Sequence, residues 1–203
     1  LKLDVRKFFD SIQHRVVKTQ LARLFKEEQL LGVFYQIIDS YAAQPERGVP
    51  IGNLSSQYFA NHYLAGLAHF IKEKLGIKAY VRYMDDMVLW HNDRNTLNVC
   101  RDAITAYIET QLQCTLKPTL LNYCTAGLPF LGYVLRPYNV QLSQRSSRRF
   151  AQKINLLERK YRSGAWTEAQ CQRQALPLIA FTQQANAKAF RKKVIFPYFS
   201  PQG

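Results

Sequence analysis

The stretch YVRYMDDMVLW, residues 80–90, places two adjacent carboxylates inside a run that otherwise has the composition of a β-strand. Strand interiors disfavour Asp, and neighbouring like charges repel each other. The aromatic and aliphatic residues on both sides predict two short strands, 78–84 and 87–90, that form a hairpin with Asp85 and Asp86 at its bend. Such an Asp pair is either ordinary turn chemistry or part of a cation site.

A third carboxylate is expected close to the hairpin. Asp4 ends a strand predicted for residues 1–5. Hard divalent cations such as Mg²⁺ prefer oxygen ligands, and a two-metal site needs carboxylates from more than one segment. If this strand neighbours the hairpin, Asp4, Asp85 and Asp86 meet at one edge of the sheet. Asp10 is instead predicted to cap the following helix, together with Gln13 three residues later.

The charge is distributed unevenly along the chain. The 203 residues carry a net charge of +14, and residues 144–203, with 12 basic and 2 acidic residues, contribute +10 of it. Such an excess suits contact with phosphate backbones, and the alternative is a solvated basic helical surface. The four cysteines and four histidines do not cluster, so no zinc site or disulfide framework is indicated. No apolar run approaches the ~20 residues of a membrane span.

The order of the predicted elements indicates an α+β fold. A helix follows Asp10, and further helices are predicted at 30–43, 54–75, 96–112, 146–162, 168–176 and 178–193. Additional strands are predicted at 115–117, 120–123 and 130–135. This order favours an antiparallel sheet with helices packed on one face. The change to a basic helical pattern predicts a domain boundary near residue 143.

Five segments together resemble the motifs of reverse transcriptases. YVRYMDDMVLW is similar to their Tyr-x-Asp-Asp motif, and LKLDVRKFFDSI to their first palm motif, a strand that ends in Asp and is followed five residues later by an aromatic residue. GVPIGNLSSQYFANHYL resembles their Gly loop with its long helix, CTLKPTLLNY the Lys-bearing motif, and LPFLGYVL the primer grip. The motifs follow the family order over residues 1–135.

The resemblance implies two domains. Residues 1–143 correspond to a polymerase palm, an antiparallel sheet with helices on one face, together with the helices next to the fingers. Residues 144–203 correspond to a helical, basic thumb. Because the chain opens within a predicted strand, we expect the fingers to precede Leu1 in a longer protein.

The stretch IGNLSSQ indicates a branch of the family. Group II intron, retron and retroviral enzymes typically carry Gln before this Gly, and the first two usually continue with Ser-Pro. Here Ile51 and Gln57 stand at the Gln and Pro positions. This pattern is similar to the reverse transcriptases of diversity-generating retroelements, bacterial and phage enzymes of the group II intron-like superfamily. Since Ile offers the incoming nucleotide only shape, the resemblance implies error-prone synthesis.

The resemblance assigns the metal and catalytic positions. Asp4 and Asp85 would be ligands of two Mg²⁺ ions, with Mn²⁺ as the alternative metal, and the Val5 carbonyl and Asp86 would support them. Lys117 would act catalytically beside the leaving pyrophosphate, or it is a surface lysine. Asp4, Asp85, Asp86 and Lys117 are therefore the predicted catalytic residues.

The same motif matching assigns the binding positions. Phe9 would block a ribose 2′-OH, and core packing beside Phe8 is the alternative. The predicted nucleotide-binding residues are Arg6, Lys7, Phe8, Phe9, Ile51, Gly52 and Gln57. The primer grip is predicted at Leu131, Gly132 and Tyr133. The cations predicted to follow a nucleic-acid backbone are Arg145, Arg148, Arg149, Arg191, Lys192 and Lys193.

The function implied is that of an RNA-directed DNA polymerase, a nucleotidyltransferase that joins a primer 3′-OH to the α-phosphate of a deoxynucleotide. Its partners would be an RNA template, a DNA or RNA primer, deoxynucleoside triphosphates and a small basic accessory protein, in the cytoplasm and without a membrane. Two alternatives stay open: another group II intron-like or retron-like reverse transcriptase, and a non-catalytic nucleic-acid-binding derivative. An RNA-dependent RNA polymerase would usually carry Gly-Asp-Asp and a polar residue at position 9.

Overall fold

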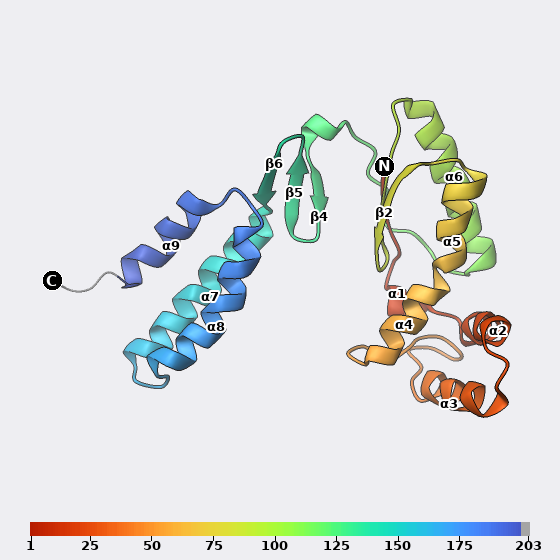
Figure 1. Cartoon of the computed structure of the whole chain (residues 1–203), viewed down its shortest axis with the longest axis horizontal. Coiled ribbons are helices and arrows are strands. Elements are labelled where there is room, and N and C mark those ends of the chain that lie inside the picture. The colour runs from red at the N-terminus through yellow and green to blue at the C-terminus, as the bar shows by residue number, and fades with distance from the viewer. Residues whose placement is uncertain (200–203) are drawn as a thin grey trace. The chain divides into compact units, whose positions relative to one another are not determined.

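The structure, a computed structural model, describes residues 1–199 of the chain (Figure 1). The chain forms two compact units, Leu1–Leu121 and Asn122–Gly203. Both combine an antiparallel three-stranded sheet with helices, so the predicted α+β class is confirmed. Within the described residues, no helix is both long enough and apolar enough to cross a bilayer.

The sheet of the first unit is built around the predicted hairpin. Its strands are β1 (Lys2–Asp4), β2 (Ala79–Tyr83) and β3 (Asp86–Trp90), in the order β1-β3-β2. In the β1–β3 register, Leu3 pairs with Met87, and both side chains are buried. Because strand side chains alternate between faces, this register turns the neighbouring polar positions to the other face.

The other edge of β1 is paired with the segment that was predicted as two short strands. Lys2 exchanges backbone hydrogen bonds with Leu120 at 2.7 and 3.0 Å, and the amide of Lys117 donates to the carbonyl of Asp4 at 2.8 Å. These contacts are isolated bridges and not a regular strand. Strand β1 therefore lies between β3 and residues 115–120.

Helices lie on the apolar face of this sheet. The helical segments of the first unit are α1 (Phe8–Ser11), α2 (His14–Leu24), α3 (Glu28–Asp39), α4 (Leu54–Tyr63), α5 (Ala65–His69), the π-helix η1 (Phe70–Lys74) and α6 (Arg94–Gln111). Figure 1 shows α5 and α6 on one face of the sheet, as predicted. The core between them includes the fully buried side chains of Leu67, Met87, Leu89 and Ile104.

Two predicted helix features of the first unit are wrong. Asp10 does not cap the helix predicted to follow it, because it lies inside α1, and α2 begins after Gln13 without a side-chain cap. The helix predicted over 54–75 is interrupted at Leu64, where φ and ψ are −93° and 2°. Its continuation ends in a π-helix that Phe70 anchors by stacking on Tyr107 at 4.9 Å.

In the part of the second unit that the structure describes, a small sheet is followed by helices. The elements are the 3₁₀ turn η2 (Cys124–Ala126), β4 (Leu128–Phe130), β5 (Tyr133–Arg136), β6 (Asn139–Leu142), α7 (Gln144–Arg162), α8 (Glu168–Gln183) and α9 (Lys188–Phe199). Helices α7 and α8 lie antiparallel, side by side (Figure 1). Phe150, Ile154 and Leu157 of α7 form the buried centre of this unit.

The second unit differs from the prediction in two ways. Helix α8 continues through Pro177, because this residue is exposed and water can satisfy the carbonyl that loses its partner. The chain leaves α8 only at Gln184, not at residue 177. The strands β4 to β6 belong to the same compact unit as the helices, so the units divide before Asn122, whereas a palm and thumb division at residue 143 stays a prediction.

Candidate functional site

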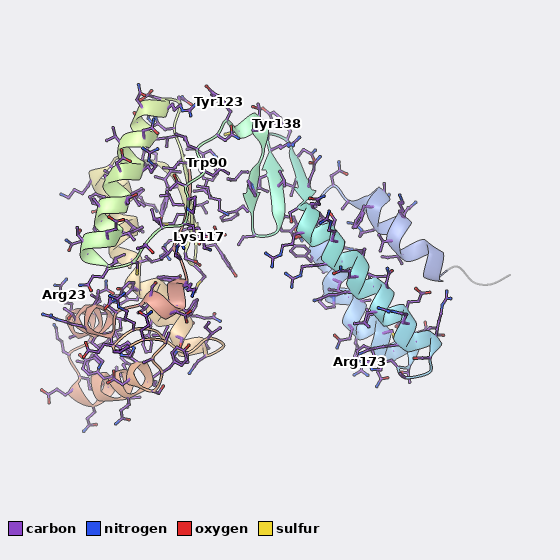
Figure 2. All side chains as sticks on the ribbon, turned by 180° about the vertical axis from the view of Figure 1, so that it is seen from behind. Arg23, Trp90, Lys117, Tyr123, Tyr138 and Arg173 are labelled. Atoms are coloured by element: carbon purple, nitrogen blue, oxygen red, sulfur yellow. The ribbon has the colours of Figure 1, made fainter. Side chains whose placement is uncertain are left out.

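Asp4 lies at the end of β1 with a lysine against its carboxylate. The Nζ atom of Lys117 lies 2.8 Å from Asp4 Oδ1 and donates to Oδ2 at 2.9 Å. This hydrogen bond to Asp4 raises the pKa of Lys117 above its usual value. Figure 2 shows Lys117 beside the strands of the first unit, with Trp90 further along the same sheet. The lysine and the carboxylate come from segments more than a hundred residues apart and are joined by strand pairing.

Asp85 lies in the two-residue turn of the hairpin. The turn begins at Met84, whose φ of +54° belongs to the left-handed region that residues other than glycine seldom adopt. Burial raises the pKa of Asp85, and the negative charges of Asp4 and Asp86 raise it further. Asp85 and Asp4 therefore lie close enough to repel each other, and the turn holds Asp85 there at the cost of backbone strain.

Asp86 is the first residue of β3 and pairs directly with Asp4 in the register. Its carboxylate Oδ1 lies 2.9 Å from the Nζ of Lys2. The prediction overlooked Lys2, although it stands two residues before Asp4, and strand alternation places both on one face. The polar face of this sheet thus carries two carboxylates, Asp4 and Asp86, each with its own ammonium group.

The carboxylates have the right chemistry for a hard divalent cation. Besides burial, the repulsion between these carboxylates raises the pKa of Asp85, and a bound cation would relieve that repulsion. In the structure, the ammonium groups of Lys2 and Lys117 offset part of the negative charge. Within the described residues, however, no three His, Cys, Asp or Glu side chains are grouped closely enough to hold a metal ion. The donor set of Asp4 and Asp85 fits Mg²⁺, and the predicted meeting of all three carboxylates around a metal stays a prediction.

The residues after Asp4 form a tight connection to α1. Val5 is fully buried. Arg6 and Lys7 are exposed, and Lys7 adopts φ +45° immediately before the helix. Phe8 is buried in the core, where its ring lies against Phe9 at 5.9 Å. Two exposed cations, Arg6 and Lys7, and a half-buried ring, Phe9, thus lie within five residues of Asp4. Phe8, which was also predicted to bind nucleotide, is a core residue.

Three predicted nucleotide-binding residues lie on the loop before α4 and on its first turn. Ile51 is 73% exposed, and Gly52, with φ +93°, has open space where a Cβ would lie. Gln57 is exposed on the first turn of α4. The cap of this helix is Asn53, whose side chain accepts from the amide of Ser55, so Gln57 does not cap it. All three residues are therefore accessible to a ligand.

The predicted primer-grip residues lie in the turn between β4 and β5 of the second unit. Leu131 and Gly132 both have positive φ, +49° and +87°. A Cβ on Gly132 would lie 2.8 Å from Ser146 Oγ and 3.0 Å from the ring of Phe181. Tyr133 stacks on Phe181 at 4.7 Å and donates its hydroxyl to the Phe181 carbonyl at 2.7 Å. This turn is thus fixed against helices α7 and α8.

The predicted backbone-binding cations are divided between two helices. Arg145, Arg148 and Arg149 are exposed on the first turns of α7. Arg149 also lines a hollow of about 210 Å³ beside Phe181. Arg191 differs, because its guanidinium donates to the carbonyl of Thr182 at 2.7 Å and ties α9 to the end of α8. Lys192 and Lys193 of α9 are exposed.

Comparisons with known proteins concern the family and the fold of the chain. Residues 1–135 match the model of the family described as reverse transcriptase (RNA-dependent DNA polymerase). The structure is similar to that of telomerase from Candida albicans in complex with the TWJ fragment of telomeric RNA, with a TM-score of 0.54 and 13% identity over 96% of this chain and 40% of that chain. A truncated apo telomerase from Candida tropicalis gives a TM-score of 0.53 and 15% identity over 70% of this chain and 35% of that one.

These structural likenesses concern the fold alone. The chain spans no more than 40% of the length of either telomerase chain. No curated protein sequence matches it.

Proposed function

Because the chain belongs to the reverse transcriptase (RNA-dependent DNA polymerase) family, we propose that it acts as part of an RNA-directed DNA polymerase that extends a primer along an RNA template. The observation that carries this proposal is the convergence of Asp4, Asp85 and Lys117. Three segments far apart in the sequence bring two repelling carboxylates and one cation to the same end of a sheet. A structural scaffold has no need of carboxylates that repel each other, whereas nucleotidyl transfer needs such carboxylates to hold a divalent cation.

A divalent cation, Mg²⁺ or Mn²⁺, would be held by Asp4 and Asp85, with Asp86 and the Val5 carbonyl in support, and would neutralise charge on the phosphates during transfer. Lys117 would offer its ammonium group to the leaving pyrophosphate. Because Asp4 raises the pKa of Lys117, this side chain keeps its proton and its charge at neutral pH. Charge neutralisation and positioning are the main demands of phosphoryl transfer.

The residues near Asp4 would select and hold the deoxynucleotide. Arg6 and Lys7 are exposed cations and would face the triphosphate. Phe9 is half-buried and would exclude a ribose 2′-OH by its bulk. Ile51 and Gly52 would shape the pocket through an apolar side chain and a close approach of the backbone.

The second unit would hold the duplex. Arg145, Arg148 and Arg149 would contact phosphates without reading sequence, and the turn of Gly132 and Tyr133 would support the primer end. In this proposal the palm ends near residue 143 and the thumb follows it. The phosphate contacts would make binding weaken as salt concentration rises.

Among reverse transcriptases we favour the branch of diversity-generating retroelements. The supporting observation is Ile51, which is 73% exposed beside Gly52, where the other branches carry Gln. An apolar side chain there gives the incoming nucleotide no hydrogen bond, and so favours error-prone synthesis. This branch would bring a small basic accessory protein and a bacterial or phage-encoded enzyme in the cytoplasm. Another group II intron-like or retron-like enzyme is the second candidate.

Primer extension by the full-length protein tests the proposal. The assay contains an RNA template, a DNA primer, deoxynucleotides and Mg²⁺, and compares the wild type with Asp4→Asn. We expect Asp4→Asn to lower the rate by about a hundredfold or more. The matched control is Asp102→Asn, an exposed carboxylate on α6 that pairs with Arg101. Template binding without extension by the wild type would instead identify a non-catalytic nucleic-acid-binding derivative.

A further inference from the structure

Residues 46–49, which precede the loop of Ile51 and Gly52, are joined to the start of α2 and to α1 by backbone hydrogen bonds. The amide of His14 donates to the carbonyl of Glu46 at 2.9 Å, and the amide of Gly48 donates to the carbonyl of Ile12 at 2.8 Å. The amide of Val49 donates to the carbonyl of Phe9 at 3.0 Å. The loop that carries Ile51 is therefore anchored to the backbone of the residue predicted to select the sugar.

The side chain of His14 adds a contact that crosses this junction. Its Nε2 lies 2.7 Å from the carbonyl oxygen of Gly48, and its Nδ1 lies 3.2 Å from Asp39 Oδ1 on α3. The ring is 6% exposed. A carbonyl oxygen can only accept a hydrogen bond, so Nε2 carries a hydrogen and donates it to Gly48. The ring therefore lies between the loop and α3 and contacts both.

Lys18 and Arg47 hold the groups around the ring. Asp39 also accepts from Lys18 on α2 at 2.7 Å, and this contact holds the pKa of Asp39 below its usual value, so the carboxylate is ionised. The loop contributes Arg47, whose guanidinium donates to the side-chain oxygen of Gln13, and Glu46, whose carbonyl is bound by the His14 amide.

Gly48 fixes the direction of the carbonyl that His14 binds. Its φ is +106°, and a Cβ there would lie 3.0 Å from the backbone nitrogen of Ala43. The peptide therefore has little freedom to turn away from the ring. The polar partners of His14 among the described residues, Gly48, Asp39 and Glu46, are not predicted nucleotide-binding residues, so an effect of His14 on the nucleotide would act through this loop.

We propose that His14 is a positioning residue that clamps the loop of residues 44–52 onto α2 and α3 and so sets Ile51 and Gly52 relative to Phe9. This role rests on the proposed function, because those three residues would shape the nucleotide pocket. Loss of either contact of the ring, with Gly48 or with Asp39, should release the loop.

The test measures nucleotide kinetics of the full-length enzyme with the variant His14→Gln. A side-chain amide cannot bridge both acceptors, so we expect the KM for deoxynucleotide to rise about tenfold while kcat and primer–template affinity stay within about twofold. An unchanged KM, or a fall in kcat as large as the rise in KM, would overturn the proposal.

Two further variants separate positioning from folding. His69→Gln removes a histidine with a similar carboxylate contact, Glu73 at 2.8 Å, on the exposed surface of α5, and should leave KM unchanged. Asp39→Asn removes the charge opposite His14 at a half-exposed position and should raise KM in the same direction even if His14→Gln folds poorly. An equal effect of His69→Gln, or no effect of Asp39→Asn, would contradict the clamp.

Amide hydrogen exchange provides a readout that needs no polymerase activity. The peptide covering residues 44–52 should lose protection in His14→Gln and in Asp39→Asn, but not in His69→Gln. Unchanged protection would refute the clamp even in an active enzyme. Loss of protection in a protein that cannot extend primers would refute the proposed function alone.

Discussion

Lys117 contacts Asp4 through both its backbone and its side chain. The backbone amide donates to the Asp4 carbonyl at 2.8 Å, and Nζ lies 2.8 Å from Oδ1 of the carboxylate. Strand pairing therefore places the ammonium group on the same oxygens that a divalent cation would use. In the proposed function, lysine and metal would compete for Asp4 unless the lysine moved to the phosphates when nucleotide binds.

Replacing Lys117 by Met should separate these two effects. Without the competing ammonium group, the Mg²⁺ concentration for half-maximal extension should fall about threefold, while kcat should fall about tenfold or more because the leaving pyrophosphate loses its cation. A Mg²⁺ titration of primer extension measures both. Lys78→Met, at the opposite end of the hairpin from Asp85, is the control and should change neither. An unaltered Mg²⁺ requirement in Lys117→Met would argue against competition at Asp4.

Asp85→Asn should abolish extension and stabilise the fold. Burial and the charges of Asp4 and Asp86 raise the pKa of Asp85, so its ionised form is unfavourable in the folded protein without metal. A neutral amide of the same shape removes that cost, and the melting temperature at neutral pH should rise by roughly 2 °C. Thermal unfolding in the presence of a chelator measures it. A lower melting temperature would show that the carboxylate is structurally needed.

The same carboxyl group gives stability a defined dependence on pH. Since its pKa is raised in the folded state, the folded protein keeps this proton to a higher pH than the unfolded chain does. The contribution of Asp85 to the free energy of unfolding therefore falls as the pH rises from the usual Asp range through the raised pKa. Comparing wild type and Asp85→Asn across this interval isolates the contribution, which the variant should lack.

Phe9→Val should weaken discrimination against ribonucleotides. Phe9 is half-buried and follows Asp4 closely, so a smaller side chain would open space for a 2′-OH. The ratio of kcat/KM for deoxy- over ribonucleotides should fall at least about tenfold. Phe8→Leu is the control, because Phe8 is buried; it should lower stability by about 1 kcal/mol without altering the ratio. If Phe8→Leu lowered this ratio and Phe9→Val did not, the sugar-selecting role would belong to Phe8.

Ile51→Gln should reduce misincorporation by several-fold. The side chain is 73% exposed, so the substitution should leave the melting temperature unchanged and act only through contact with nucleotide. Sequencing of cDNA copied from a defined template gives the error spectrum. Leu54→Gln, also exposed and three residues along the chain, is the control. The same error spectrum in wild type and Ile51→Gln would remove the argument for a loosely selecting pocket.

The hairpin and its carboxylates could be predicted because local signals suffice for them. Aromatic and aliphatic residues flank Asp85 and Asp86, and alternation in β1 indicates which of its residues share a face. The partners of these carboxylates are not local. That Lys117 meets Asp4, and Lys2 meets Asp86, depends on β1 lying between β3 and residues 115–120, which no periodicity reveals. The two-residue spacing of Lys2 and Asp4, which places both on one face of β1, is the one signal in the sequence for these lysine partners.

The errors in helix prediction have similar causes. Pro177 is a strong local breaker, yet α8 continues through it because the position is exposed. The helix predicted over 54–75 has a continuous apolar pattern, yet packing against α6 decides its shape. At Gly66, the hydroxyl of Tyr107 lies only 2.8 Å from the position that a Cβ would occupy, so a larger residue would clash there. Tertiary contacts override local propensity at such places.

Gly132→Ala should destabilise the second unit more than the backbone conformation alone explains. Gly132 has φ +87°, and a Cβ there would meet Ser146 Oγ at 2.8 Å and the Phe181 ring at 3.0 Å. Gly164 has φ +70° and nothing within 4 Å of its Cβ position, so Gly164→Ala reports the strain of positive φ without a clash. We expect a loss of about 1 kcal/mol for Gly164→Ala and about 2 kcal/mol or more for Gly132→Ala. Urea unfolding of the Trp90→Phe protein, in which Trp166 alone reports on the second unit, measures the difference, and equal losses would show that α7 and α8 do not press on this turn.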